Sequence, residues 1–510
     1  MSHYLCYDLK GIQQYIFQVP KLKCCIGGSR MVDDFDRITV VDMEKQHPDC
    51  RKIYSGGGKG AFSGEKDKLD ELKKDLVRCA MARGLTIRFG ESEDYSTGAT
   101  EITETFCYQP DSLDGQPCEL SGMYPTTEGI HKVFKDRNQK GSDHGEESMT
   151  ENKFLSEIRG RVHEAESASF FYDVAADSRE GKNAAFALGN RNRWAVVCMD
   201  GNDMGEQFRQ FKKQHQNSND ADAVWGAWLG KMSPALDDCT CRAAQEAMIE
   251  VVKQYGQEEG KDGFEIIPIR PLIIGGDDIT LLIHCNYASL FVKTAIEKFN
   301  EFSKEYRELW VGTGGELTIS AGILYAPVTL PLNMAIGYAE MLLASAKTRG
   351  RDEKKKNGGS VSEPCVDWES VTEGFLTEPH IRRRELKFKD EEIGREVVLT
   401  KRPYTLKEFI ELEDKFKYLQ KVPWSILHEL KTSLCASKPE RLAFYAKLGK
   451  NWPEIAKDLQ EPLPDSDGKY GEAWNDKPTK QLQTDLLDRI LLLEEEKRMQ
   501  NPTVSNEEED

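Results

Sequence analysis

The sequence lacks the features of an exported or membrane-spanning chain. Its first residues, Met1–Asp8, contain neither the basic nor the apolar region of a signal peptide, and no apolar run approaches the length of a membrane span. Positive charge is also in deficit, because 87 acidic residues outnumber 69 basic ones and the formal net charge is -18. Such a surface does not attract nucleic acid or anionic membranes by bulk electrostatics, so any RNA contact must be local or made through partner proteins.

Paired metal-ligand motifs are missing as well. The 13 cysteines are scattered through predicted strands and helices, which fits reduced thiols in a cytoplasm better than a disulfide framework. Residues 107–190 contain no C-x-x-C or H-x-x-x-H pair, so the sequence does not favour a zinc site there. The side chains that such a site would have to use are Cys107, Cys118, His131, His144 and His163.

What the sequence contains instead is an internal duplication. The same order of apolar segments and glycine-rich turns occurs twice: strand, helix, hairpin, helix, strand. In the first copy the segments lie at residues 4–9, 11–17, 52–62, 67–83 and 85–89. In the second copy they lie at residues 194–199, 234–255, 266–283, 287–306 and 316–325. This order is typical of βαββαβ, ferredoxin-like units, so we predict an α+β protein that contains two of them.

The two copies differ at the turn of the hairpin. In the second copy, the apolar runs Pro271–Ile274 and Ile279–Ile283 flank the turn Gly275–Asp278, a pattern that predicts a β-hairpin. Its two adjacent carboxylates repel each other, which indicates a cation that neutralises them; a solvated hairpin tip is the alternative. The turn of the first copy, Gly56–Gly60, has no acidic residue. A purely structural turn has little reason to differ in this way, so the difference favours chemistry in the second copy.

A third carboxylate is expected beside this turn. Asp200 ends the first strand of the second copy, and that strand neighbours the central hairpin in a βαββαβ sheet, so Asp200, Asp277 and Asp278 can converge. Metal-assisted nucleotidyl transfer needs carboxylates of this kind to hold divalent ions near an α-phosphate. Lys347, on a predicted helix at 339–347, could reach a triphosphate; a solvated lysine at a helix end is the alternative.

These motifs resemble a known family. Residues 200–205, the Gly-Gly-Asp-Asp turn, residues 319–322 and the helix at 339–347 resemble the palm domain of GGDEF-type nucleotide cyclases. The arrangement of two palms is more specific. Residues 11–17, 27–29 and 55–58 resemble the first palm of the large polymerase-cyclase subunit of type III CRISPR effector complexes, and residues 403–406 resemble part of its closing helical domain. The resemblance covers nearly the whole chain.

The resemblance implies a function, its cofactors and its site residues. That family makes cyclic oligoadenylates from ATP when its complex recognises foreign RNA through a guide RNA. It implies catalysis by Asp277 and Asp278, with Mg²⁺ or Mn²⁺ held by these two residues and Asp200. The nucleotide contacts that it implies come from Gly275, Gly276, Asp203 and Lys347, and for a second nucleotide from Gly57, Gly58 and Ser29. Binding to other effector subunits, guide RNA and target RNA in the cytoplasm follows from the same resemblance.

Two departures keep other functions open. The chain contains no His-Asp dipeptide, so we expect no HD nuclease domain and no DNA nuclease activity. The zinc finger that often lies between the palms of this family is reduced to Cys118 and Gly122. The alternatives are a stand-alone cyclic nucleotide synthase that needs no guide RNA, and a scaffold subunit whose palms are catalytically silent. The intact acids at Asp200, Asp277 and Asp278 argue against the scaffold.

We predict the following division of the chain. It runs from a first palm without catalytic acids (1–106), through an inter-palm region with a degenerate zinc finger (107–190) and a second palm (191–350), to a linker (351–379), a helical C-terminal domain (380–495) and a disordered acidic tail (496–510).

Overall fold

The computed structural model describes most of the two duplicated units and of the C-terminal part. The described residues are 3–19, 22–93, 104–107, 133, 135–137, 139, 169–170, 193–215, 221–259, 266–372, 377–390, 395–416, 419–420, 422–434, 438–453, 474–476 and 481–496. The zinc ligands considered above, apart from the exposed Cys107, and the predicted tail beyond residue 496 lie outside these residues. Among the described helices, none combines the length and the apolar character that crossing a membrane requires.

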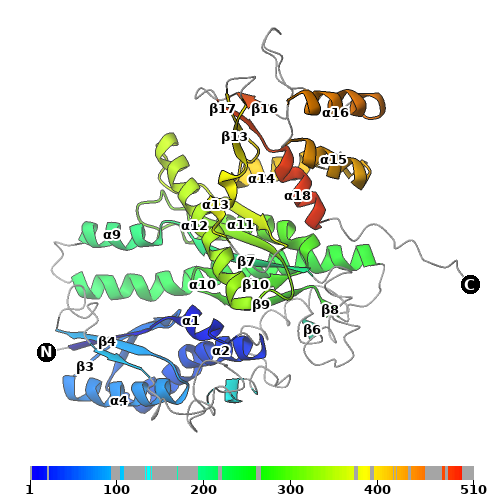
Figure 1. The fold of residues 1–510 in the computed structure, drawn as a ribbon. Coiled ribbons are helices and arrows are strands. Elements are labelled where there is room, and N and C mark those ends of the chain that lie inside the picture. The colour runs from blue at the N-terminus through cyan, green and yellow to red at the C-terminus, as the bar shows by residue number, and fades with distance from the viewer. Residues whose placement is uncertain are drawn as a thin grey trace, which may run out of the picture.

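The first unit, blue in Figure 1, is built on a sheet with the strand order β2-β3-β1-β4-β5. Its strands are β1 (His3–Leu9), β2 (Arg51–Gly56), β3 (Lys59–Gly64), β4 (Ile87–Ser92) and β5 (Glu104–Phe106). Its helices are α1 (Ile12–Phe17), α2 (Leu22–Asp34), α3 (Val40–Gln46) and α4 (Lys66–Ala82), with a π-helical turn, η1 (Phe35–Thr39), between α2 and α3. Strand β1 lies between β3 and β4 and is antiparallel to both, as a βαββαβ unit requires.

The second unit repeats this arrangement in a sheet with the strand order β15-β12-β11-β7-β10-β9. Its strands are β7 (Arg193–Gly201), β9 (Ile269–Gly275), β10 (Asp278–Ile283), β11 (Ile319–Pro327), β12 (Cys365–Ser370) and β15 (Tyr404–Thr405). Its helices are α9 (Met204–His215), α10 (Ala221–Glu259), α11 (Ala288–Ser303) and α12 (Leu332–Asn357), with short 3-10 turns η3 (Cys285–Tyr287) and η4 (Lys304–Tyr306). A separate two-stranded pair joins β6 (Ser169–Phe170) to β8 (Ile266–Ile267). The α+β fold with two palm-like units is therefore confirmed.

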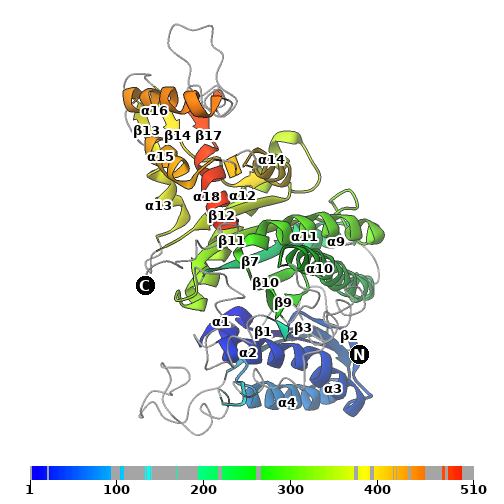
Figure 2. The ribbon, with the colours of Figure 1, turned by 90° about the vertical axis from the view of Figure 1, so that its right-hand side faces the viewer.

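Alternating side chains along β7 give the second sheet two apolar faces. Val197 packs in a core with α10 and α11, whereas Val196 packs in a core with α12. Helix α10 also packs against the first unit, because Cys6 and Ala61, on the sheet of the first unit, belong to the same core as α10. Figure 2 shows the result: the first unit lies below the second, and the C-terminal part lies at the opposite end.

Residues 351–379, predicted to be a linker, include part of the second unit. Helix α12 continues to Asn357 and ends at Gly358, whose φ of 63° is the left-handed conformation that closes helices. Strand β12 then pairs in parallel with β11, with Val366 opposite Ala321. The prediction of a linker was wrong because the last turns of α12 are rich in charged residues. These residues form ion pairs along the helix, such as the pair between Glu353 and Lys356 at 2.8 Å.

The C-terminal part is helical, as expected, and it also contains a sheet that the sequence analysis does not predict. Its helices are α13 (Pro379–Arg384), α14 (Leu406–Phe416), α15 (Trp424–Leu434), α16 (Lys438–Asn451) and α18 (Leu486–Glu496). The strands, in the order β13-β14-β17-β16, are β13 (Lys387–Asp390), β14 (Arg395–Val398), β17 (Gln481–Thr484) and β16 (Trp474–Asp476). Strands of three or four residues are too short for their alternation to be recognised in a sequence.

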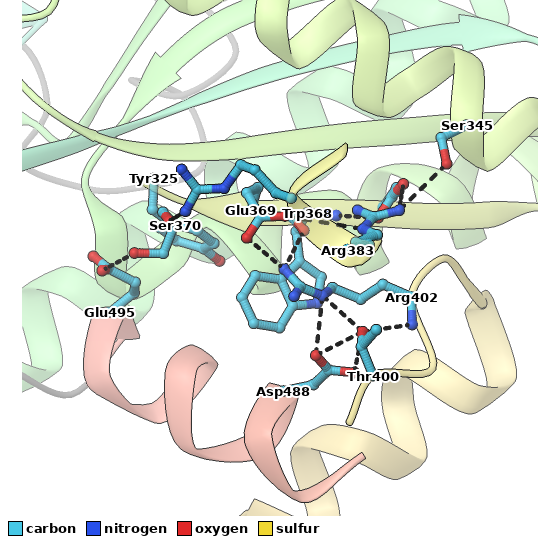
Figure 3. Close-up of polar contacts among 12 residues, drawn as sticks. Tyr325, Ser345, Trp368, Glu369, Ser370, Arg383, Thr400, Arg402, Asp488 and Glu495 are labelled. Carbon is cyan, nitrogen blue, oxygen red and sulfur yellow. Dashed lines mark hydrogen bonds and ion pairs between the residues drawn. The ribbon is translucent and has the colours of Figure 1, made fainter. Parts of the chain in front are cut away.

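A buried ionic network joins this part to the second palm (Figure 3). The Arg402 guanidinium lies 4.7 Å from the centre of the Trp368 ring, between two carboxylates. It is 2.9 Å from Glu369, which follows Trp368 on β12, and 2.9 Å from Asp488 on α18. A second pair, Arg193 and Glu495 at 2.9 Å, links the first residue of β7 to the end of α18. The C-terminal helix is therefore fixed to the palm by side chains that water does not screen.

The end of α18 predicts a pH dependence of stability. Burial of the Glu496 carboxyl raises its pKa from 4.5 to about 8, and repulsion from the nearby Glu413 carboxylate is the second cause of this increase. Because the folded-state pKa lies above the unfolded one, stability is lost as pH rises from about 4.5 through about 8. A glutamine oxygen can still accept the hydrogen bond that Tyr325 donates at 2.7 Å. Glu496→Gln is therefore expected to be more stable than the wild type at pH 9, by about 1–2 kcal/mol, and to differ little at pH 5.

Urea denaturation at several pH values measures this difference. The control is Glu301→Gln, an exposed residue of α11 whose side chain is 61% accessible. Parallel pH profiles for Glu496→Gln and the wild type would contradict the prediction.

Candidate active site

Three carboxylates meet where β7 ends and the β9–β10 hairpin turns. In the register of β7 and β10, Asp278 stands directly opposite Asp200. The Gly201 N–H donates to the Asp277 carbonyl oxygen at 3.1 Å, which holds the hairpin turn against the end of β7. A Cβ on Gly201 would lie 2.9 Å from the Asp277 Cβ, so this close approach requires glycine. The structure thus brings together the three acids that the sequence analysis selected.

The acids lie in a locally negative environment. Burial, followed by repulsion from Asp200, raises the pKa of Asp277 and of Asp278 from 3.8 to about 7. The opposing charge comes from Lys347 on α12, whose ammonium group forms an ion pair with Asp200 and donates to the Gly201 carbonyl oxygen at 2.8 Å. One ammonium group facing three carboxylates leaves the cluster short of positive charge.

The donor set suits a divalent ion such as Mg²⁺ or Mn²⁺. Carboxylate and carbonyl oxygens are the ligands that these ions prefer. The raised pKa values of Asp277 and Asp278 reflect repulsion between carboxylates, which a bound cation would reduce. Within the described ranges, however, no three His, Cys, Asp or Glu side chains already form a metal-binding group. An ion bound by Asp200 would compete with the ammonium group of Lys347, which pairs with this carboxylate.

A cavity of about 390 Å³ lies between the β9–β10 hairpin and the first palm. The hairpin and residues 233–237 of α10 form one wall, and α1, α2, η1 and the β2–β3 turn form the other. The sequence-selected residues that line this cavity are Ser29, Gly57, Gly58, Gly275, Gly276, Asp277 and Asp278. The Ser29 hydroxyl donates to the Leu272 carbonyl oxygen on β9, so it joins the two palms directly.

A wider groove of about 1040 Å³ opens on the other side of Asp277. Asp200 lines it, and the basic face of α12 forms part of its wall. The cationic residues that line it are Lys347, Arg351, Lys354 and Lys355 on α12 and Arg209 on α9. Clustered cations of this kind bind phosphate groups. The sequence analysis selected Lys347 alone; the spacing of Lys347, Arg351 and Lys354 on one helical face was the available signal, and the linker assignment concealed it.

Asp203 frames this groove. Among the non-glycine residues that the structure describes, only Asp203 has a positive φ, at 61°; it lies in the turn between β7 and α9. Its carboxylate accepts hydrogen bonds from the Ser362 N–H at 2.7 Å and the Ser362 hydroxyl at 2.9 Å, and it pairs with Lys354 at 3.1 Å. Asp203 therefore ties the β7–α9 turn to the segment that follows α12, and it orients Lys354 along the groove.

The first palm contributes polar residues that the sequence analysis missed. Asp36 accepts a hydrogen bond from the Gly58 N–H at 2.5 Å and one from the Tyr7 hydroxyl at 3.2 Å, so it holds the glycine turn. Burial raises the pKa of Asp36 to about 6. Arg37 bridges the palms, since it lies 2.6 Å from Asp33 in the first palm and 3.6 Å from Asp237 in the second. Apart from the pair between Arg37 and Asp33, which is four residues apart, these are long-range contacts, for which a single sequence carries no local signal.

Fold and site together define a protein with two palm domains, of which the second carries the acids. Residues 193–355 match the family model described as Cas10/Cmr2, second palm domain. The match covers the second palm and does not extend to the first palm or the C-terminal part. No curated protein sequence matches the chain.

Several solved structures resemble the chain. A Csm1-Csm4 cassette in complex with cA4 has 12% identity and a TM-score of 0.48, over 97% of this chain and 70% of that one. The apo Csm1-Csm4 cassette has 14% identity and a TM-score of 0.46, over the same shares of the two chains. The Csm1-Csm4 subcomplex of the type III-A CRISPR-Csm interference complex has 12% identity and a TM-score of 0.46, again over 97% and 70%. At TM-scores below 0.5 and identities below 25%, no argument about function rests on these similarities.

Proposed function

We propose that the chain is a metal-dependent nucleotidyltransferase that makes cyclic oligoadenylates from ATP, as the large subunit of an RNA-guided type III CRISPR complex. One observation carries the proposal: Asp277 lines both the inter-palm cavity and the basic groove. A carboxylate at such a junction can serve a reaction whose two substrates approach from opposite sides. The Cas10/Cmr2 family match supports the choice of reaction, and adenine follows from the sequence resemblance.

The two cavities suit the two substrates. The triphosphate of the donor ATP occupies the basic groove, with its phosphates against Lys347 and Arg351 and its α-phosphate near the three acids. The acceptor nucleotide occupies the inter-palm cavity, whose 390 Å³ lies within the range of small-molecule sites. The 3′-hydroxyl of the acceptor loses its proton to water and its oxygen forms a bond to the α-phosphorus, the bond from that phosphorus to the bridging oxygen breaks, and pyrophosphate leaves through the groove.

The acids would hold the divalent ions that this reaction needs. Asp200, Asp277 and Asp278 are the residues for this role. A bound Mg²⁺ or Mn²⁺ supplies Lewis-acid activation of the 3′-hydroxyl and stabilises the departing pyrophosphate. The protein itself orients the carboxylates through the β7–β10 register and provides the cationic wall of the groove.

A product assay tests the proposal. The purified chain is incubated with each labelled nucleoside triphosphate and Mg²⁺ or Mn²⁺, with and without any co-purifying RNA complex, and the products are identified by mass spectrometry. Products from ATP that require the complex and target RNA support the proposal. Products from the chain alone would identify a stand-alone synthase, and no product under any condition, with partners still bound, would identify a scaffold subunit.

Lys347→Met is expected to weaken ATP binding. The variant removes a cation that sits at the junction of the acids and the groove, and charge-assisted hydrogen bonds of this kind contribute about 1.5–3 kcal/mol. We therefore expect the KM for ATP to rise about 10- to 100-fold. The matched control is Lys356→Met, further along the same helix, whose side chain is 62% exposed. An unchanged KM in the Lys347 variant would place the triphosphate elsewhere.

A further inference from the structure

The first palm has no acid at its own glycine turn, yet one of its side chains reaches the acids of the second palm. The Gln13 side-chain amide on α1 donates a hydrogen bond to the Asp278 carboxylate at 3.4 Å. The two residues are 265 positions apart in the chain, and both line the inter-palm cavity. The contact therefore exists only when the two palms lie together.

Helix α1 holds this amide in a defined place. It begins after Gly11, which has a φ of 67°, and the Gly11 carbonyl oxygen accepts the Tyr15 N–H at 2.7 Å. The buried Tyr15 ring anchors the helix, because its hydroxyl donates to the Arg83 carbonyl oxygen at 2.7 Å. The neighbouring Gln14 is exposed, whereas Gln13 faces the cavity. The backbone that carries Gln13 is therefore held on both sides of it, at Gly11 and at Tyr15.

Other first-palm side chains hold the same hairpin. Ser29 on α2 donates to the Leu272 carbonyl oxygen of β9. Arg37 pairs with Asp237, whose carboxylate in turn accepts the Gly276 N–H of the hairpin turn at 3.3 Å. Contacts thus run along the hairpin from its strand through its turn, and Gln13 adds the contact at the carboxylate itself.

The chemistry of an amide suits this position. Repulsion from Asp200 and Glu340 acts on Asp278, while the ammonium group of Lys347 lies against Asp200. A lysine or arginine in place of Gln13 would neutralise the carboxylate and compete with a cation. A neutral amide donor fixes one carboxylate oxygen and leaves its negative charge available to an ion.

We propose that Gln13 is a positioning residue that holds Asp278 in the orientation that binds a divalent ion, so that the metal site of the second palm is complete only in contact with the first palm. The inference rests on the proposed function in one respect, namely that Asp278 binds the ion. It assigns the first palm a part in assembling the metal site, in addition to holding the second nucleotide.

Metal binding without turnover tests the inference. Gln13→Met keeps the length of the side chain and removes its donor, and Gln14→Met is the matched control on the exposed side of the same helix. Titration of the metal-free protein with Mn²⁺, followed by electron paramagnetic resonance, is expected to give about tenfold weaker binding in Gln13→Met and wild-type binding in Gln14→Met, since residues that orient metal ligands typically contribute 10- to 100-fold. If Gln13→Met does not fold, Gln13→Asn, whose amide is one methylene too short, replaces it.

Kinetics give a second readout. The Mg²⁺ concentration for half-maximal activity is expected to rise about tenfold in Gln13→Met, with most of the kcat recovered at saturating Mg²⁺ and the KM for ATP little changed. A variant that merely loosens the fold would not be rescued by metal.

The outcomes separate this inference from the proposed function. Mn²⁺ affinity equal to that of the wild type in Gln13→Met, while Asp278→Asn binds the ion more weakly, would overturn the inference. So would a wild-type protein that binds Mn²⁺ no better than Asp277→Asn/Asp278→Asn. If the wild type forms no product but Gln13→Met still binds Mn²⁺ more weakly, the proposed function fails and the role of Gln13 stands.

Discussion

The double variant Asp277→Asn/Asp278→Asn is expected to lose nucleotidyl transfer by at least about 1000-fold while its fold becomes more stable. Asparagine preserves the size of aspartate and one of its acceptor oxygens, but it does not carry the charge that binds Mg²⁺ or Mn²⁺. A metal ion contributes several kcal/mol of transition-state stabilisation, and about 4 kcal/mol corresponds to three orders of magnitude in rate.

The gain in stability has a separate cause. Both carboxyl groups have a pKa raised to about 7 by burial and by repulsion from Asp200, so their charged forms oppose folding at neutral pH. Removing both charges is expected to raise the free energy of unfolding of the metal-free protein by about 1–2 kcal/mol at pH 8.

Product formation and urea unfolding, both at pH 8, measure the two effects. Asp42→Asn, an exposed acid of α3 whose side chain is 49% accessible, is the control and should change neither. Product formation that survives in the double variant would place the catalytic acids elsewhere. A loss of stability would mean that these carboxylates serve the fold.

Arg402→Met is expected to destabilise the C-terminal part by about 3–5 kcal/mol, because it leaves two buried carboxylates, Glu369 and Asp488, without their shared cation. Both carboxylates are almost inaccessible to water, at 6% and 0% of their side-chain area, so solvent cannot compensate for the loss. Methionine retains part of the packing against Trp368, which keeps the effect mainly electrostatic.

Hydrogen exchange of α18 and β12 under increasing urea is the appropriate measurement, since separate domains do not unfold in one step. In the double variant Arg402→Met/Asp488→Asn, part of the stability is expected to return because one of the two charges is gone. Arg384→Met, an exposed arginine of α13, is the control. Equal exchange rates in Arg402→Met and the wild type would contradict the prediction.

Local patterns in the sequence were sufficient to predict the strand and the hairpin that carry the three acids. Apolar runs on both sides of Gly275–Asp278 predicted the hairpin, and the neighbouring positions of strand and hairpin in a βαββαβ unit placed Asp200 beside it. Contacts made by polar side chains across long separations were not predictable. Gln13 reaches Asp278 through the docking of two domains, and nothing in its sequence neighbourhood indicates this partner.

The basic groove illustrates a different limit. The charged stretch from Arg349 to Lys356 has the composition of a solvated linker, and composition alone does not distinguish a linker from the exposed face of a helix. The distinction depends on the opposite face, where Leu342 and Leu343 pack in a core with the sheet and Ala346 is buried. Once α12 is extended to Asn357, Lys347, Arg351 and Lys354 lie along one wall.

The ion pair between Lys347 and Asp200 has a consequence for the order of binding. Lys347 is a competitor attached to the protein itself, and a tethered group of this kind acts at an effective concentration on the order of millimolar or more. A free divalent ion that binds Asp200 must displace the ammonium group of Lys347, and it offers this group no other partner. A nucleotide that arrives with its ion brings phosphates to which the ammonium group can transfer. On the proposed function, ion and nucleotide would therefore bind cooperatively, and an ion that arrives without nucleotide would bind more weakly.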